Sequence, residues 1–343
     1  MMMRTLVESD PVCEQFTLSK SCAIPEQADL VYTQTYGASD VLDQIRYCSR
    51  PFVVHMGGDI WYELRTFAPQ RLRIIESVLK RAMVIVANSR FLYGLIRSHG
   101  YKNVIFLPGG LWGFDHTVHG VSPKRIYVKK NYAQSGPITM LMSISIQVQK
   151  KYLGIQKFME IAHPFLKSIN ARIICAGAVN EKKFAQQMSK FYGVEFIGHR
   201  NDWGELLPSA DIFLHPSLFD CFPRALAEAK CAGIPSLAFG VTGNVEVGDS
   251  PIFCDPKNPE EIVTSLENLC RDVELREYLG RLSNANAIKK TERHRTDYSY
   301  ILKDLVTEGP TQLIRESEVA YYDSIGDGRS GFYRFAPDKT IAG

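Results

Sequence analysis

Asp220 and Glu228 lie eight positions apart in a segment, Phe213 to Gly233, that reads FLHPSLFDCFPRALAEAKCAG. This segment reads as an apolar strand, a short loop and a helix with Pro223 near its first position. In open α/β sheets, ligands bind in the loops beyond the carboxyl ends of the strands. A carboxylate accepts hydrogen bonds through two oxygens, which suits a pair of neighbouring hydroxyl groups. The segment therefore predicts a site for a ligand that carries hydroxyls.

The start of this helix predicts a second kind of chemistry. Backbone N–H groups from Cys221 to Arg224 would point toward the loop, where they and the partial positive charge of the helix attract anions. Glu228 lies about 7.5 Å further along the axis, at about 1.5 Å per residue. A nucleotide-sugar has this length, with phosphate and sugar at the helix start and ribose beside its second turn.

Each of these residues also has an ordinary structural interpretation. Arg224 and Glu228 are four residues apart and could form an exposed helix pair worth about 0.2–0.5 kcal/mol. Asp220 could be a turn residue or a helix cap. For an isolated pair of carboxylates the structural interpretation is preferable, so the choice depends on the rest of the chain.

The composition is that of an ordinary globular protein. The 343 residues suit two domains, with 45% hydrophobic and 22% charged residues and a net charge of +3. No basic tract indicates nucleic acid binding. The eight cysteines form no C-x-x-C pair and no zinc spacing, which indicates small core residues in a reducing compartment. No apolar run approaches the roughly 18 residues of a membrane span, and the start does not resemble a signal peptide. We therefore expect a cytoplasmic protein. No metal or cofactor is expected, because no D-x-D motif lies in a suitable loop and helix amides with Lys can hold a diphosphate.

From Asp29 onward, predicted strands and helices alternate, which indicates parallel strands joined by right-handed crossovers. One edge strand is conceivable within residues 1–28. The first half then predicts strands at 29–34, 51–56, 83–89 and 103–108, with helices at 38–47, 70–82 and 90–98. After an aperiodic linker at 113–137, the second half predicts strands at 138–145, 171–177, 194–198, 212–214, 235–239 and 252–255. Its helices are expected at 154–166, 181–191, 203–207, 223–232, 259–270, 274–287 and 298–306.

The segment Phe213 to Gly233, here called the signature segment, resembles the sequence signature of retaining glycosyltransferases with the GT-B fold. This large group is often called family four. Their pattern is a Pro-Ser pair, two glutamates eight positions apart, Ala, Gly and a Pro that opens the next strand. Here it reads Pro216-Ser217, Asp220, Glu228-Ala229, Gly233 and Pro235, with Asp in place of the first Glu. The resemblance implies an α/β protein of two Rossmann-like domains that face a cleft. Its landmarks run in order over some 140 residues: Gly177, Gly198, Ala210-Asp211, Gly243-Asn244 and Asp255 with Glu260-Glu261.

The first half is similar to the acceptor-side domain of the same family, in which strands end in His, Asn-Ser and Pro-x-Gly. Here these are His55, Asn88-Ser89 and Pro108-Gly109-Gly110, while the front portion of the domain is shortened. The resemblance implies that His55 lines the reaction centre. Gly57, Gly58 and Asp59 are candidates for acceptor binding. A lone His at a strand end is also commonly structural, and Asp59 could equally be a turn residue or a cap.

Phosphate binding requires cations, which the family supplies as an Arg and, five residues on, a Lys before a Gly. Here the loop offers Lys150 and Lys151 before Gly154, but no Arg at the expected place. Lys151 would stabilise phosphate charge, and Arg224 is a conceivable substitute for the Arg.

Further donor contacts are implied by the resemblance. They are Asp220, Ser217 and the amides of Cys221 and Phe222 for the sugar, Glu228 for the ribose, His199 for the base and Gly243 for the phosphates.

We therefore expect a shortened acceptor domain at 1–120, a donor domain at 121–297 and a C-terminal helix and tail at 298–343 that pack back on the first domain. The expected activity is transfer of a hexose or deoxyhexose from a UDP- or GDP-sugar to a hydroxyl acceptor, such as a growing glycan, with retention. His55, Asp220 and Lys151 would be the catalytic set. Two alternatives remain open: a non-catalytic nucleotide-sugar-binding or scaffold protein, and a GT-B epimerase or phosphorylase.

Overall fold

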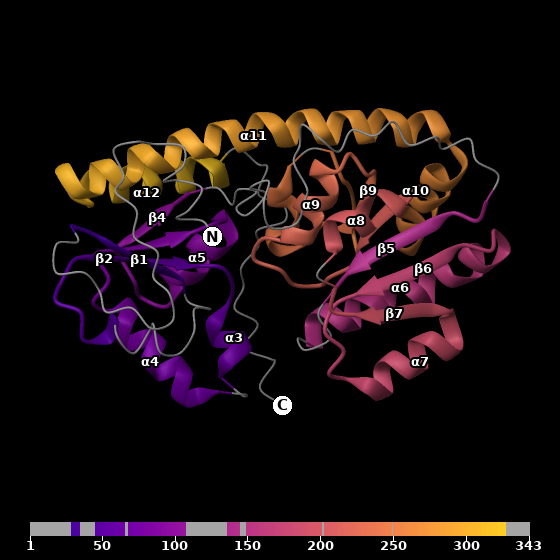
Figure 1. Cartoon of the computed structure of the whole chain (residues 1–343), viewed down its shortest axis with the longest axis horizontal. Coiled ribbons are helices and arrows are strands. Elements are labelled where there is room, and N and C mark those ends of the chain that lie inside the picture. The colour runs from indigo at the N-terminus through magenta and orange to yellow at the C-terminus, as the bar shows by residue number, and fades with distance from the viewer. Residues whose placement is uncertain are drawn as a thin grey trace.

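The computed structural model describes residues 29–34, 45–65, 68–107, 136–144, 149–200, 202–248 and 250–326. Two α/β units lie side by side, each built on a parallel sheet (Figure 1). The first sheet has the order β1-β2-β3-β4, and the second has the order β10-β9-β8-β5-β6-β7. The expected α/β class, with two units built on parallel sheets, is therefore confirmed.

The first sheet is buried on both faces, as its continuous apolar strands require. Its strands are β1 (Val31–Gln34), β2 (Phe52–Met56), β3 (Val84–Ala87) and β4 (Val104–Phe106). Because the strands follow one another in sequence order, right-handed crossovers place their helices on one face. These helices are α3 (Ile60–Leu64), α4 (Pro69–Leu79) and α5 (Arg90–Ser98).

The inward side of α4 is as predicted, since its periodic apolar residues are buried: Leu72, Ile75, Val78 and Leu79.

The second sheet places the signature segment at a topological switch point. From β5 (Thr139–Ser143) the chain builds outward through β6 (Arg172–Ala176) and β7 (Val194–Gly198). It then returns to β8 (Ile212–His215) on the other side of β5 and continues through β9 (Ser236–Phe239) to β10 (Ile252–Cys254). Ligands of open α/β sheets bind where the strand order reverses, here beyond the ends of β5 and β8.

The helices of this unit are α6 (Gln149–Ser168), α7 (Lys182–Tyr192), α8 (Trp203–Leu206), α9 (Arg224–Cys231) and α10 (Pro259–Arg271). Short 3-10 turns are η1 (Leu207–Ser209) and η2 (Thr242–Val247).

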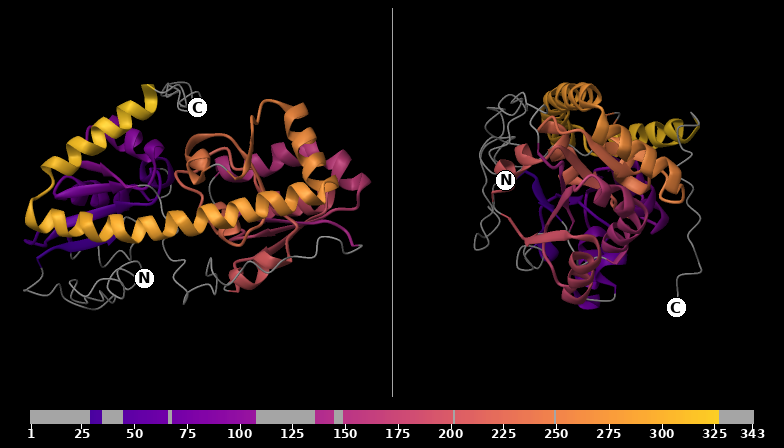
Figure 2. Two further views of the ribbon diagram at one scale, coloured as in Figure 1. Left: turned by 90° about the horizontal axis from the view of Figure 1, so that it is seen from above. Right: turned by 90° about the vertical axis from the view of Figure 1, so that its right-hand side faces the viewer.

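The C-terminal region differs from the prediction. Instead of separate helices at 274–287 and 298–306, one helix, α11 (Val273–Thr307), runs over both units, as Figure 2 shows from above. The segment after it, which lacked a clear pattern, forms α12 (Thr311–Gly326). The two helices cover the second face of the first sheet, where Leu305, Ile301 and Ile314 pack on an apolar layer that includes Val53 and Val86.

Helix α12 is fixed to the first unit by specific contacts. Ser317 Oγ accepts a hydrogen bond from the N–H of Phe106 in β4, and Glu318 pairs with Arg97 at 2.6 Å. The hydroxyl of Tyr321 lies over Gly94 of α5, where a Cβ would be only 2.3 Å from it. These contacts join α12 to β4 and α5.

Several predictions lie outside the described residues: the edge strand within 1–28, most of the helix at 38–47, the Pro108-Gly109-Gly110 turn, most of the linker and the last part of the tail. The six cysteines that the structure describes are buried and free, as expected of core residues. Within the described part of the chain, no helix is both long and apolar enough to cross a membrane.

Candidate active site

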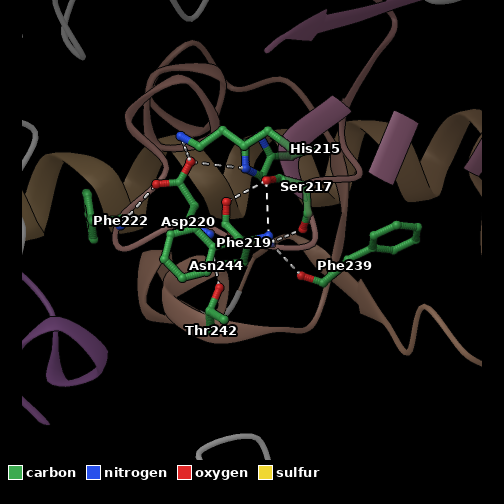
Figure 3. Close-up of polar contacts among 9 residues, drawn as sticks. His215, Ser217, Phe219, Asp220, Phe222, Phe239, Thr242 and Asn244 are labelled. Carbon is green, nitrogen blue, oxygen red and sulfur yellow. Dashed lines mark hydrogen bonds and ion pairs between the residues drawn. The ribbon is translucent and has the colours of Figure 1, made fainter. Parts of the chain in front are cut away.

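At the switch point, the first turn of α6 meets the loop that follows β8, and Lys151 pairs there with Asp220. Lys151 Nζ lies 2.8 Å from Asp220 Oδ2, and the N–H of Phe222 donates to Asp220 Oδ1 at 3.3 Å (Figure 3). Both charged side chains are largely buried, with 21% and 13% of the side chain exposed. Burial raises the pKa of Asp220, but the ammonium of Lys151 and the other donors outweigh it and hold the pKa below 3.8. Asp220 is therefore a carboxylate at neutral pH.

The loop around Asp220 is folded tightly by its own polar groups. Ser217 Oγ donates to the carbonyl of Phe219 at 2.7 Å and accepts from the N–H of Phe219 at 3.3 Å. The hydroxyl of Ser217 is fully buried and holds the turn, whereas the sequence suggested a donor contact.

Two glycines allow neighbouring segments to approach this loop. A Cβ at Gly154 of α6 would lie 1.8 Å from the carbonyl oxygen of Pro216, and one at Gly243 would lie 1.8 Å from that of Cys221. The N–H of Gly243 donates to the carbonyl of Asp220 at 2.8 Å, so this amide supports the loop. Gly154 and Gly243 therefore position Lys151 and Asp220 through backbone contact.

His215, at the end of β8, is a residue of this cluster that the sequence did not single out. It is 3% exposed, and its Nε2 lies 3.9 Å from Asp220 Oδ2. No hydrogen bond of normal geometry reaches either ring nitrogen, although the nearby Asn244 side chain raises the pKa slightly. Burial lowers the pKa of His215 to about 4, although the carboxylate of Asp220 opposes this shift. The ring is neutral at neutral pH.

Asn244 fastens the loop after β9 to the signature loop. Its Nδ2 donates to the carbonyls of Ser217 and Phe239 at 3.0 and 2.9 Å (Figure 3). The sequence indicated this residue only as a landmark of the resemblance, because a side chain that joins two loops leaves no local pattern.

Glu228 lies in the second turn of α9 and is 7% exposed. Burial raises its pKa to about 7, and the guanidinium of Arg224 offsets this only in part. Arg224 Nη2 is 4.0 Å from Glu228 Oε1, and the Arg224 side chain is 60% exposed. Arg224 and Glu228 have the spacing of an ordinary helix pair. The structural interpretation assumed that this pair is exposed, whereas the carboxylate of Glu228 is buried. A buried carboxylate with this pKa is costly to keep charged, which is typical of a functional site.

His55 lies at the carboxyl end of β2, and its Nδ1 is 2.5 Å from the hydroxyl of Tyr32 in β1. Burial and the charge of Arg224 lower its pKa to about 4. The charge of Arg224, at the start of α9, therefore acts on His55 at the end of β2. No local pattern points to Tyr32, because its pairing with His55 depends on strand register.

The acceptor-binding candidates lie at the start of α3 in the first unit. Asp59 is buried and caps α3, accepting from the N–H of Tyr62 at 2.9 Å, which is the structural alternative for this residue. Gly57 and Gly58 precede this cap. His199 is exposed beyond β7, the strand at the sheet edge. The side chain of Lys150 lies outside the described residues.

The carboxyl ends of the two sheets face each other and are in contact. Phe219, from the signature loop, packs its ring against Tyr62 and Phe91 of the first unit, with centroids 5.4 and 5.7 Å apart. Glu246 of η2 accepts from the N–H groups of Arg90 and Phe91 at 2.9 and 2.8 Å. The sequence did not predict either contact. Across the described residues, no cluster of His, Cys, Asp or Glu side chains could hold a metal ion.

Comparison with known proteins agrees with this arrangement. Residues 141–272 match the family Glycosyl transferases group 1. An uncharacterised glycosyltransferase of Methanocaldococcus jannaschii is 24% identical over 207 residues, which are 55% of this chain and 51% of that protein. The N-acetyl-alpha-D-glucosaminyl L-malate synthase of Bacillus anthracis is 23% identical over 232 residues, 63% of this chain and 55% of its own. The chain thus spans about half the length of the curated relatives it matches.

Solved structures support the same fold. Anabaena HepE in complex with UDP and glucose has a TM-score of 0.62 at 19% identity, covering 81% of this chain and 78% of that one. The sucrose-phosphate synthase of Thermosynechococcus elongatus has a TM-score of 0.58 at 12% identity, with 81% and 73% covered. The GT-B fold expected from the sequence is therefore confirmed.

Proposed function

We propose that this chain, whose residues 141–272 match the family Glycosyl transferases group 1, transfers a sugar from a nucleotide-sugar to a hydroxyl group of a carbohydrate or glycoconjugate. The donor is a UDP- or GDP-hexose or deoxyhexose. The observation that carries this proposal is the placement of Lys151, Asp220 and buried Glu228 around α9, at the switch point of the second sheet. A cation and two carboxylates at this spacing match the diphosphate, sugar and ribose of one ligand.

In this proposal, Lys151 binds the diphosphate and stabilises the negative charge that grows on the leaving phosphate. Asp220 accepts hydrogen bonds from hydroxyls of the transferred sugar. Glu228 accepts from the ribose hydroxyls, which replace the solvation that its carboxylate lost on burial. His55, neutral at pH 7, lines the reaction centre from the first unit, where it can donate or accept one hydrogen bond but adds no charge.

Retention at the anomeric carbon is part of the proposal and rests on the resemblance to retaining enzymes of this fold. Asp220 contacts Lys151 and the N–H of Phe222, so its oxygens are engaged as acceptors rather than set aside as a nucleophile. A retaining reaction would therefore rely on positioning and electrostatic stabilisation around the leaving phosphate.

The test is incubation of the purified chain with a panel of UDP- and GDP-sugars and simple glycan acceptors. We expect release of nucleoside diphosphate with at least one donor, its loss in Asp220→Asn and Lys151→Met, and an unchanged anomeric configuration in the product. Absence of binding to every nucleotide-sugar, measured by calorimetry on folded protein, would refute the proposal.

A second candidate is a nucleotide-sugar-binding protein without turnover. The observation that favours it is the missing Arg five residues before Lys151, where the sequence has Ile146. The same panel separates the two, because a binding protein would bind a donor tightly and release no diphosphate.

A further inference from the structure

Glu246 occupies the amino end of a helix in the other unit. Its two carboxylate oxygens accept from the N–H groups of Arg90 and Phe91 in the first turn of α5, while Ser89 Oγ accepts from the N–H of Leu92 at 3.0 Å. A helix start leaves four N–H groups without a partner in the helix, and three of these are thus hydrogen-bonded here. Two of the three donate to an acceptor in the second unit. The Glu246 side chain is 5% exposed, so these are buried, charge-assisted hydrogen bonds.

The same helix start receives a second contact from the second unit. The ring of Phe219, in the loop that carries Asp220, packs edge-on against the ring of Phe91 and is buried among apolar residues of the first unit. Phe91 is therefore held by Glu246 through its backbone and by Phe219 through its side chain. Two separate loops of the second unit, after β8 and after β9, converge on one residue of the first.

These two loops are also bonded to each other beside Asp220. The N–H of Asp220 donates to Thr242 Oγ1 at 3.1 Å, and the N–H of Gly243 donates to the carbonyl of Asp220 at 2.8 Å. Thr242 has a φ of +48°, a left-handed conformation that is strained for a β-branched residue. Such strain persists only where the surroundings hold the backbone in place.

We propose that Glu246 is a positioning residue for the signature loop. By binding the start of α5, it holds η2 and its strained Thr242 in place, and through Thr242 and Gly243 it fixes the backbone of Asp220. Contact between the two units is in this way coupled to the shape of the donor loop. The inference rests on the proposed function only for the identity of the ligand that Asp220 contacts.

The test compares Glu246→Ala and Glu246→Gln with the wild type by amide hydrogen exchange resolved to single residues. Both variants should speed exchange at Arg90 and Phe91, and Leu92, whose partner is Ser89, should change little. Exchange should also rise at Asp220 and Gly243, on the far side of η2. Glu260→Ala, an exposed glutamate of α10, serves as the matched control and should leave all five sites unchanged.

A faster exchange confined to Arg90 and Phe91 would make Glu246 a helix cap and nothing more, and would overturn the proposal. Unchanged exchange at every site in both variants would overturn it as well. Glu246→Gln keeps one acceptor oxygen and the size of the side chain, so it remains informative if Glu246→Ala fails to fold.

A second readout is the affinity for a UDP- or GDP-sugar that the wild type binds, which we expect to fall about tenfold in Glu246→Ala. If the wild type binds no nucleotide-sugar, the proposed function fails, while the exchange data still decide the role of Glu246. If the wild type binds and the affinity of Glu246→Ala is unchanged, the positioning role is refuted and the proposed function stands.

Discussion

Lys151, in the first turn of α6, forms an ion pair at 2.8 Å with Asp220, in the signature loop. A diphosphate that binds Lys151 must compete with Asp220 for the ammonium group. We expect Lys151→Met to weaken nucleotide-sugar binding about tenfold or more, the value of one charge-assisted hydrogen bond of about 1.5–3 kcal/mol. Calorimetric titration measures this, with Lys150→Met as the neighbouring control. Equal losses in both variants would mean that either lysine serves equally.

The low pKa of Asp220 makes a prediction for acid stability. Because the folded-state pKa lies below the ordinary 3.8, the stabilisation is complete above that pH and is lost as the pH falls through the folded-state value. Asp220→Asn should therefore differ most from the wild type in free energy of unfolding near neutrality, and the difference should shrink toward pH 3. Urea denaturation at a series of pH values measures it. A difference that is independent of pH would contradict the prediction.

The contribution of Glu228 to folding stability should depend on pH in the opposite direction. Burial raises its pKa from 4.5 to about 7, so the folded state holds the proton more tightly and loses stability as the pH rises from 4.5 to 7. Glu228→Gln should remove this loss, a gain of up to about 3 kcal/mol at pH 8 relative to pH 4. The same variant should bind nucleotide-sugars more weakly, since it loses a charged acceptor. Thermal denaturation and calorimetry together test this exchange of stability for binding, and unchanged affinity for every donor would refute the ribose role.

The neutral His215 predicts a third pH effect. Its pKa is lowered from 6.5 to about 4 by burial, so stability is complete above pH 6.5 and falls as the pH drops toward 4. In the wild type this partly cancels the gain from Glu228 over the same range. His215→Phe should leave a smaller decline in the free energy of unfolding between pH 6.5 and 4, by up to about 3 kcal/mol. Denaturation curves at both pH values measure it, and an equal decline would show that the ring does not titrate there.

The packing of α12 on α5 can be tested at Gly94. A Cβ there would lie 2.3 Å from Tyr321 Oη, so Gly94→Ala should destabilise the protein by about 1–3 kcal/mol. Adding Tyr321→Phe removes the clashing oxygen and should restore part of the loss. Gly136→Ala, which meets nothing within 4 Å, is the control. Denaturant midpoints measure all three, and full stability in Gly94→Ala would mean that α12 is held elsewhere.

The sequence predicted what local patterns encode. The apolar runs at β2 and β3, the inward side of α4 and the strand, loop and helix around Asp220 are all within a few residues of their observed bounds. These features depend on periodicity and turn residues, which a short window contains.

What the sequence did not reveal depends on contacts between distant segments. Glu246 bonds residues some 155 positions away, and Asn244 joins two loops that no spacing relates. The sequence predicted separate helices at 274–287 and 298–306, yet α11 is continuous, because a helix that bridges two units need not keep one apolar side throughout. The hydroxyl of Ser217 and the amide of Gly243 matched a ligand-binding pattern and hold the loop instead.

The covering of the first sheet by α11 and α12 has a consequence for the order of folding during translation. The strands of that sheet leave the ribosome early, but the layer that seals their second apolar face is made after the whole donor unit. We therefore expect the first unit to complete its folding last. Until residues beyond 300 emerge, the second apolar face of its sheet is exposed and can bind chaperones. Pulse proteolysis of ribosome-bound chains of increasing length tests this order, because the first unit should resist cleavage only in chains that include α11 and α12.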